Sequence, residues 1–232
     1  MATFSKFSRP ETPTGGIISD RDLDIIEVVL RYRFSPTSEL VRLVAANQDV
    51  TQRRLRKLWE HRLINRFAFP FPRPHSEFIY YLDNRQALEL LAQYSRLPEI
   101  HPQMEEELRL NREADYATAS ISGQHMKLGF LQHSLMISRL HFMLEMASRQ
   151  LNSRAQLASW HHGAELRGHK AEVPEISSTR VAGGNEYVWK EHDNRPQKLP
   201  VEPDAVLSLR FNDDRVSHFC YEADRGTMPW RT

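Results

Sequence analysis

Residues 49–66, with the sequence DVTQRRLRKLWEHRLINR, combine two faces of opposite chemistry and set the strongest limit on the fold. Asp49 is followed three residues later by glutamine, as in a capping box, so we expect a helix to begin at Asp49. Leu55, Leu58 and Trp59 recur at helical spacing along this segment. The pattern therefore predicts an amphipathic helix whose apolar face lies in a core.

The opposite face of this predicted helix is polar and basic. Its exposed residues are predicted to be Thr51, Gln52, Arg53, Arg54, Arg56 and Lys57. Between residues 50 and 74 the chain has seven Lys or Arg residues and one acidic residue, Glu60. Such donors suit the phosphate oxygens and base edges of DNA. The alternative, from charge alone, is a helix face that is merely solvated.

Two further amphipathic segments precede the basic helix. The first is predicted to run from a Ser19 cap to about Arg31. The second is predicted to begin at Ser35, with Pro36 at its first helical position. Three short helices, of which the third is basic, are typical of a helix-turn-helix DNA-binding domain.

Two apolar segments after the basic helix predict the winged form of this domain. Residues 63–67 and 78–82 are expected to pair as strands, and the proline-rich residues 69–75 between them form the wing. A further helix is expected to begin at Asp83. The DNA-binding residues of strand and wing are expected to be Arg66, Arg73 and His75. Winged domains also contact proteins, so a protein-interaction module is an alternative.

Residues 128–151 are strongly apolar and predict one long helix. Apolar side chains keep a three-four spacing from Phe130 through Ile137 to Leu151, and a second apolar stripe lies beside them. A helix that is apolar over two stripes has to be covered on more than one side. We therefore expect either burial within one chain or a homodimer formed through residues 128–151. His133 is expected to be a hydrogen-bonded core histidine.

A hairpin is predicted near the end of the sequence. Strands are expected at residues 204–211 and 215–223, and a three-residue turn between them puts Asp204 opposite Glu222. Opposed carboxylates repel unless a cation lies between them or one of them is protonated. The functional hypothesis is a magnesium ion held by Asp204 and Glu222. The alternative is a pair of solvated carboxylates at the strand ends.

These residues also resemble two known groups of proteins. The Pro203-Asp204 pair and the run Glu222-Ala223-Asp224 resemble the metal-binding hairpin of PD-(D/E)xK nucleases. In a nuclease of this kind the catalytic residues would be Asp204, Glu222 and Asp224. Asp224 stands where those nucleases have a catalytic lysine, so we expect no enzymatic activity and no required cofactor.

Together with the winged helix and the Leu131-Gln132-His133 segment, the hairpin resembles the replication-relaxation family over about residues 19–224. The resemblance implies a DNA-binding protein of a bacterial mobile element, associated with plasmid replication and DNA relaxation.

The predicted fold class is α+β, in four parts. A flexible leader (1–18) is followed by a winged helix-turn-helix domain (19–97), a linker with the long apolar helix (98–155), and a small, truncated α/β PD-(D/E)xK-like region (156–232). The expected function is sequence-specific binding of double-stranded DNA, as an accessory or regulatory factor in plasmid replication, transfer or transposition. The alternatives are a metal-dependent DNA nuclease and a protein-interaction module.

The expected partners are DNA, a second copy of the chain, and replication or transfer proteins of the mobile element. The sequence has one cysteine, Cys220, and no run of about 20 apolar residues. We therefore expect a cytoplasmic protein that does not bind membranes.

Overall fold

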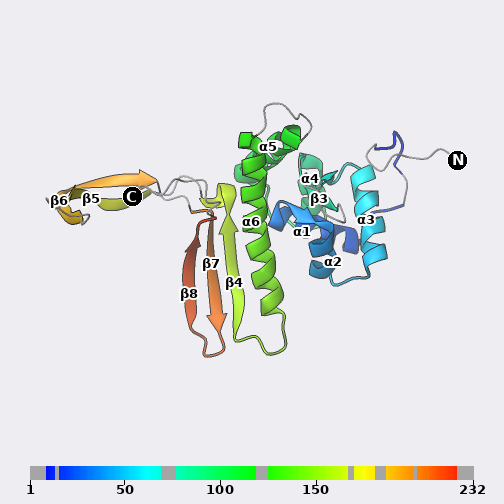
Figure 1. The fold of residues 1–232 in the computed structure, drawn as a ribbon. Helices are drawn as coiled ribbons and strands as arrows, with labels where there is room; N and C mark the ends of the chain where they lie inside the picture. Colours follow the sequence, from blue (N-terminus) through cyan, green and yellow to red (C-terminus); the bar gives the residue numbers. More distant parts are fainter. Residues whose placement is uncertain are drawn as a thin grey trace.

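In the computed structural model, the described residues are 9–13, 16–68, 77–118, 125–166, 170–180, 187–200 and 203–223. They form a mixed α+β fold with six α-helices, two three-stranded antiparallel sheets and a two-stranded hairpin (Figure 1). The long helix α6 (His125–Ser148) stands between the N-terminal helices on one side and the C-terminal three-stranded sheet on the other.

The N-terminal unit has the element order helix, strand, helix, helix, strand, strand, helix. The elements are α1 (Asp20–Tyr32), β1 (Ser35–Pro36), α2 (Thr37–Leu43), α3 (Gln48–Glu60), β2 (Asn65–Ala68), β3 (Phe78–Tyr81) and α4 (Arg85–Gln93). In the sheet, β3 lies between β1 and β2, with Ser35 opposite Tyr80 and Phe67 opposite Ile79. The three predicted helices and the predicted strand pair are present in the expected order.

One hydrophobic core joins α1, α3 and α4. The side chains that are fully buried in it include Ile26 of α1, Leu55 and Leu58 of α3, and Leu88 of α4. Because the apolar residues of each helix recur at helical spacing, they share one face, and each helix packs that apolar face into the core. The predicted inner face of the basic helix is therefore confirmed.

Three helix starts differ from the predictions by one or two residues. Asn47 rather than Asp49 caps α3, because its side-chain oxygen accepts the Asp49 N–H at 2.9 Å. Pro36 pairs within the first sheet and precedes α2 instead of standing in its first turn. Asp83 accepts a hydrogen bond from Asn65 at 2.8 Å and stays outside α4. In each case a neighbouring polar contact or strand pair decides where the helix begins.

The helix α6 is covered on more than one side, as predicted. Leu131 packs with the aromatic cluster of the N-terminal sheet, Phe142 packs with Tyr32 of α1, and Ile137 packs with Ala205 of the C-terminal sheet. The helix ends at Ser148, so the predicted seam stops earlier than residue 151. The apolar side chains of α6 therefore pack against other elements of the same chain. Dimerisation through residues 128–151 stays a prediction.

Helix α5 (Pro102–Thr118) precedes α6, and the C-terminal sheet follows it in the order β4-β7-β8. Its strands are β4 (Ala155–His162), β7 (Ala205–Phe211) and β8 (Val216–Tyr221). Phe211 N–H donates to the Arg215 carbonyl at 2.9 Å, so the predicted turn and register of the hairpin are confirmed. Strand β4, which pairs with β7 from Ala155 to His162 with one register shift between Leu157 and Ser159, was not predicted from the sequence.

Three other elements were also missed. A short 3-10 helix, η1 (Gly163–Leu166), follows β4, and the strands β5 (Lys170–Arg180) and β6 (Tyr187–Pro200) pair only with each other among the described strands. Figure 1 shows this second hairpin standing away from the other described elements. The C-terminal half therefore contains more strand than the sequence patterns predicted.

Candidate functional site

Asp22 of α1 decides which basic side chains of α3 remain available. Its buried carboxylate accepts hydrogen bonds from Arg54 at 2.9 Å, from Lys57 at 3.0 Å, and from both the N–H and the hydroxyl of Ser19 at 2.9 Å. Burial opposes ionisation, but these hydrogen bonds outweigh it and hold the pKa of Asp22 below its usual value. Arg54 and Lys57 thus join α3 to α1.

Thr51 also differs from its predicted place. It is buried, and its hydroxyl donates to the Asn47 carbonyl at 3.0 Å, so its prediction as an exposed residue was wrong. Thr51 lies one helical turn before Leu55 and therefore shares the inner face of α3. The outer face keeps three of the predicted residues: Gln52, Arg53 and Arg56.

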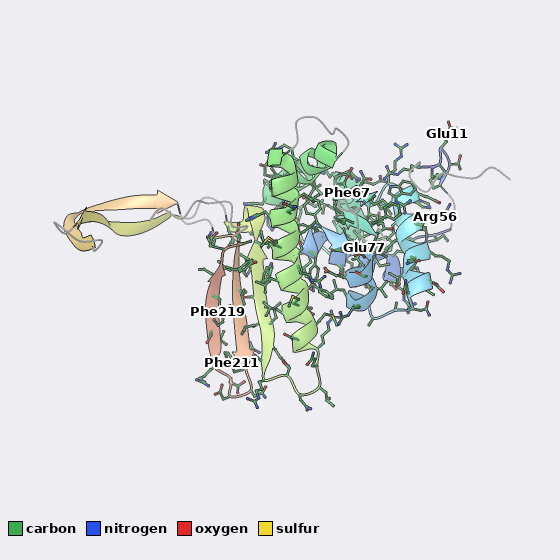
Figure 2. The ribbon with its side chains drawn as sticks, viewed as in Figure 1. Glu11, Arg56, Phe67, Glu77, Phe211 and Phe219 are labelled. Carbon is green, nitrogen blue, oxygen red and sulfur yellow. The ribbon has the colours of Figure 1, made fainter. Side chains whose placement is uncertain are left out.

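The outer face of α3 is open to solvent. Arg56 is labelled on it in Figure 2, and its side chain is 59% exposed although its Nε donates to Glu60 at 2.8 Å. Arg53 Nε donates to the Asp49 carbonyl at 3.3 Å, and the residue is exposed. Both guanidinium groups therefore keep N–H donors that face solvent.

Of the other residues predicted to bind DNA, the structure describes only some. Arg66 stacks over Trp59, with 3.8 Å between its guanidinium carbon and the ring centroid, and over Phe78 at 4.1 Å. Arg9 also lies over Trp59, at 5.2 Å, so the predicted leader contacts the N-terminal unit at this residue. No sequence signal marked Arg9 beforehand. The wing residues Arg73 and His75 lie outside the described residues.

A second cluster lies where the C-terminal hairpin begins and ends. Asp204 directly precedes β7 and Glu222 directly follows β8, one residue beyond the last strand pair, Ala205 with Tyr221. Burial raises the pKa of the Glu222 carboxyl, and the charge of Asp204 raises it further. The opposition of these two carboxylates, predicted from the turn length, is therefore present. Asp224 lies outside the described residues.

His133 of α6 belongs to this cluster. Its Nε2 lies 2.6 Å from Asp204 Oδ1, and the Ala223 N–H donates to Asp204 Oδ2 at 2.6 Å. The prediction of a hydrogen-bonded core histidine is right about the hydrogen bond, but the side chain is 28% exposed. Its partner, Asp204, lies 71 residues away in the sequence, and no local sequence pattern predicted this contact.

Within the part of the chain that the structure describes, no group of three or more His, Cys, Asp or Glu side chains is arranged to hold a metal ion. His133 Nε2 contacts the Asp204 carboxylate directly, whereas two ligands of one metal ion would have the ion between them. Asp204 and Glu222 nevertheless supply the oxygen donors that hard divalent cations prefer.

Comparison with known proteins identifies the family. The model of the replication-relaxation family matches residues 27–232. The chain belongs to the replication-relaxation family. This confirms the resemblance seen in the sequence, and membership is consistent with a role in the replication of mobile elements. No curated protein and no solved structure matches the chain. Among the described helices, none is long and apolar enough to span a membrane.

In this replication-relaxation protein, a stack of rings joins the N-terminal unit to the C-terminal sheet. His141 of α6 stacks on Tyr32 of α1 and on Trp160 of β4, with ring centroids 4.2 and 4.4 Å apart. Burial lowers the pKa of His141 to about 3, and the neighbouring His162 ring and the charge of Arg31 act in the same direction. Burial and the charge of Arg33 likewise lower the pKa of His162 to about 3. Both rings are therefore neutral at the junction.

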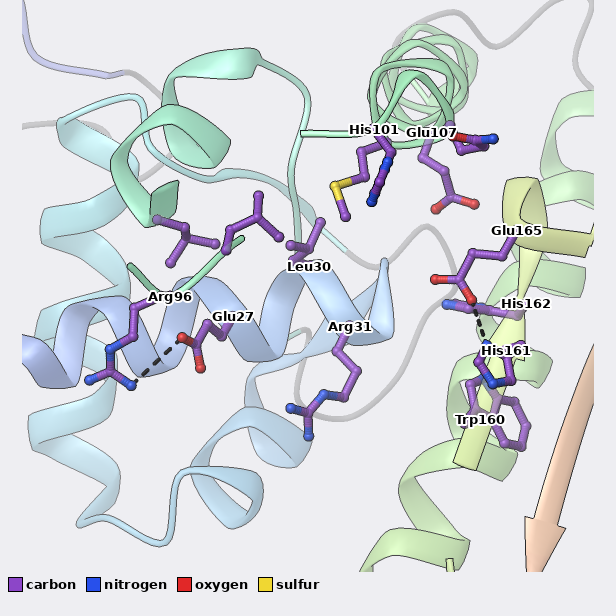
Figure 3. A pocket seen from close by; sticks show the side chains of 14 residues that line it. Glu27, Leu30, Arg31, Arg96, His101, Glu107, Trp160, His161, His162 and Glu165 are labelled. Carbon is purple, nitrogen blue, oxygen red and sulfur yellow. Dashed lines mark hydrogen bonds and ion pairs between the residues drawn. The ribbon is translucent and has the colours of Figure 1, made fainter. Parts of the chain in front are cut away.

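A cavity of about 690 Å³ lies beside this stack, between α1, the start of α5 and β4 (Figure 3). Two pairs form between side chains that line it: Arg96 with Glu27 at 3.6 Å, and His161 with Glu165 at 3.1 Å. The cavity has the size of a small-molecule site. The junction between the two halves is therefore not fully packed.

Proposed function

We propose that this protein binds double-stranded DNA through the outer face of α3, and that its N-terminal unit acts as a winged helix-turn-helix domain. The observation that carries the proposal is the exposed set Gln52, Arg53 and Arg56 on the third helix of the unit. The order of α1, β1, α2, α3, β2 and β3 supports it, because winged domains place their third helix in the major groove.

The exposed side chains suit the two kinds of contact that such a helix makes. Arginine donates two parallel hydrogen bonds to guanine or binds phosphate, and glutamine can pair with adenine. Arg54 and Lys57 contribute less than the sequence suggested, because Asp22 holds both. We propose that sequence choice depends on Gln52 and affinity on Arg53 and Arg56.

Replacing Arg53 and Arg56 together with Ala is expected to weaken duplex binding and to reduce its dependence on salt. Each lost phosphate contact lowers the slope of log K against log salt by about 0.9, so the double variant should lose up to about two units. Fluorescence anisotropy with a random duplex at several salt concentrations measures this slope.

The matched control is the double variant Arg85→Ala, Arg215→Ala, which removes the same charge from exposed side chains of α4 and of the hairpin turn. It should bind as the original chain does. Equal losses in the two double variants would show that α3 is not the contact surface. Binding that does not depend on salt would instead favour the alternative, a protein-interaction module.

In the cell, we propose an accessory or regulatory role at a DNA site of a mobile element, together with replication or transfer proteins of that element. A homodimer would present two copies of α3 to one site. Of the described residues of α6, Met136 and Met143 are the exposed large apolar side chains available to such a contact.

A metal-dependent nuclease is the second candidate function. It is favoured by the meeting of Asp204 and Glu222 at the hairpin end, where burial and the charge of Asp204 raise the pKa of Glu222. In that case Asp204 and Glu222 would hold a divalent cation through their carboxylate oxygens. Such a cation would polarise the scissile phosphate and the attacking water.

Incubation with supercoiled plasmid and Mg²⁺ or Mn²⁺ separates the two candidates. We expect DNA to be bound but not cut, because Asp224 brings negative charge where nucleases of this kind have a lysine. Agarose gels would detect nicked circles. Nicking that disappears in the double variant Asp204→Ala, Glu222→Ala would make the protein a nuclease.

A further inference from the structure

We propose that the cavity between α1, α5 and β4 is a binding site for a small aromatic molecule that carries one anionic group. The apolar and ring-bearing walls of the cavity hold the aromatic part, and Arg31 of α1 binds the anionic group. The inference goes beyond DNA binding and does not depend on it, because none of the exposed α3 residues Gln52, Arg53 and Arg56 lines the cavity.

The cavity lies where the N-terminal unit, α5 and the C-terminal sheet meet. Figure 3 shows Arg31 of α1 across the cavity from Trp160 and His162 of β4. The volume of about 690 Å³ is within the range of small-molecule sites, which often form where two units of a fold adjoin. A molecule bound there would contact both halves of the chain.

One wall of the cavity is apolar. Leu91 of α4 is fully buried in the core of the N-terminal unit, whereas Leu30, Leu97 and Met104 pack against that core but are only partly buried. These three side chains therefore keep apolar surface that faces the cavity. An apolar group that covered this surface would be stabilised in proportion to the area removed from water.

The opposite wall carries rings. Trp160 and His162 lie with their ring centroids 6.3 Å apart and their planes at 64°, an edge-to-face arrangement that a further aromatic ring can extend. Trp160 is held in place by its stack on His141. The His162 ring hydrogen-bonds the backbone carbonyl of Arg31, so β4 also fixes the position of α1 beside the cavity. These walls favour a planar aromatic ligand.

The charges around the cavity decide the sign of the ligand. Each glutamate that lines it has a basic partner: the pairs are Glu27 with Arg96, Glu107 with Arg33, and Glu165 with His161. Arg31 is exposed, and its side chain forms no hydrogen bond or ion pair with the other residues that the structure describes. A guanidinium group can donate two parallel hydrogen bonds to an oxyanion. The cavity therefore favours a ligand with one negative charge.

Two fluorescent probes test the proposal on the full chain without DNA. Anilinonaphthalene sulfonate has aromatic rings and one anionic group, and phenylnaphthylamine has the same rings without the charge. We expect the original chain to bind both. Arg31→Gln should weaken binding of the sulfonate about 10-fold, because a hydrogen bond to a charged group is worth about one tenfold step in affinity. Arg31→Gln should leave binding of the neutral probe unchanged. Arg85→Gln, at a side chain of α4 that is 60% exposed and outside the cavity, is the matched control.

A second pair of variants locates the probes. Met104→Trp fills the cavity and should abolish binding of both probes. Met143→Trp adds the same bulk to a side chain of α6 that is 55% exposed and outside the cavity, so this variant should bind both probes as the original chain does. Near-ultraviolet circular dichroism checks that each variant keeps its tertiary packing.

Three results would overturn the proposal. The original chain could fail to bind the sulfonate, Met104→Trp could bind both probes as before, or Arg31→Gln could bind the sulfonate as tightly as the original chain. Because Arg31 is exposed, its replacement tests the proposal even if Met104→Trp does not fold. None of these results bears on DNA binding through α3, which the salt dependence of the Arg53 and Arg56 variants tests separately.

Discussion

Asp22→Ala is expected to lower the free energy of unfolding by about 3 kcal/mol. Asp22 is fully buried and is the shared acceptor for Arg54 and Lys57, so its removal leaves two cations at the junction of α1 and α3 without their partner. Both cations remain partly exposed, and water can relieve some of the loss. Thermal unfolding should show a fall in Tm of roughly 6 to 12 °C for a chain of this size.

Asp24→Ala is the matched control for this variant. Asp24 lies on the same helix and pairs with Arg96 at 3.3 Å, but half of its side chain is exposed. Surface ion pairs contribute little, so this change should cost less than about 1 kcal/mol. A similar cost for both variants would mean that Asp22 does not organise the junction of α1 and α3.

Acid is expected to destabilise the protein as the pH falls below 6.5. His141 and His162 have pKa values of about 3 in the folded chain, against 6.5 as the ordinary value. Between these values the unfolded chain binds more protons than the folded one, so stability falls with falling pH and is unaffected above 6.5. Each ring can contribute up to about 1.4 kcal/mol per pH unit in this window. Denaturant unfolding at pH 7, 6 and 5 measures the slope.

His141→Phe should reduce that slope, because phenylalanine can stack on Tyr32 and Trp160 but does not take up a proton. His101→Phe is the control, since His101 is about half exposed and is not one of the stacked rings. The explanation fails if both variants keep the slope of the original chain. A smaller slope in His141→Phe alone would place the acid sensitivity at the junction.

Several parts of the fold follow from the sequence alone. The inner faces of the helices follow from the spacing of apolar residues, because backbone geometry fixes which side chains share a face. The register of Asp204 with Glu222 follows from the length of one turn in the same way. Both features depend on distances of a few residues along the chain, which the sequence shows directly.

The tertiary structure decided which of these residues find partners. Asp22 takes Arg54 and Lys57 away from the predicted DNA-binding face, and His133 meets Asp204 across 71 residues of sequence. Such pairs form only where separate helices and strands pack together, so no local pattern predicts them. The sequence determined the helices of the N-terminal unit, their apolar faces and the β7–β8 hairpin. Packing determined which polar side chains stay available for function, because a buried charge must find a partner that local spacing does not specify.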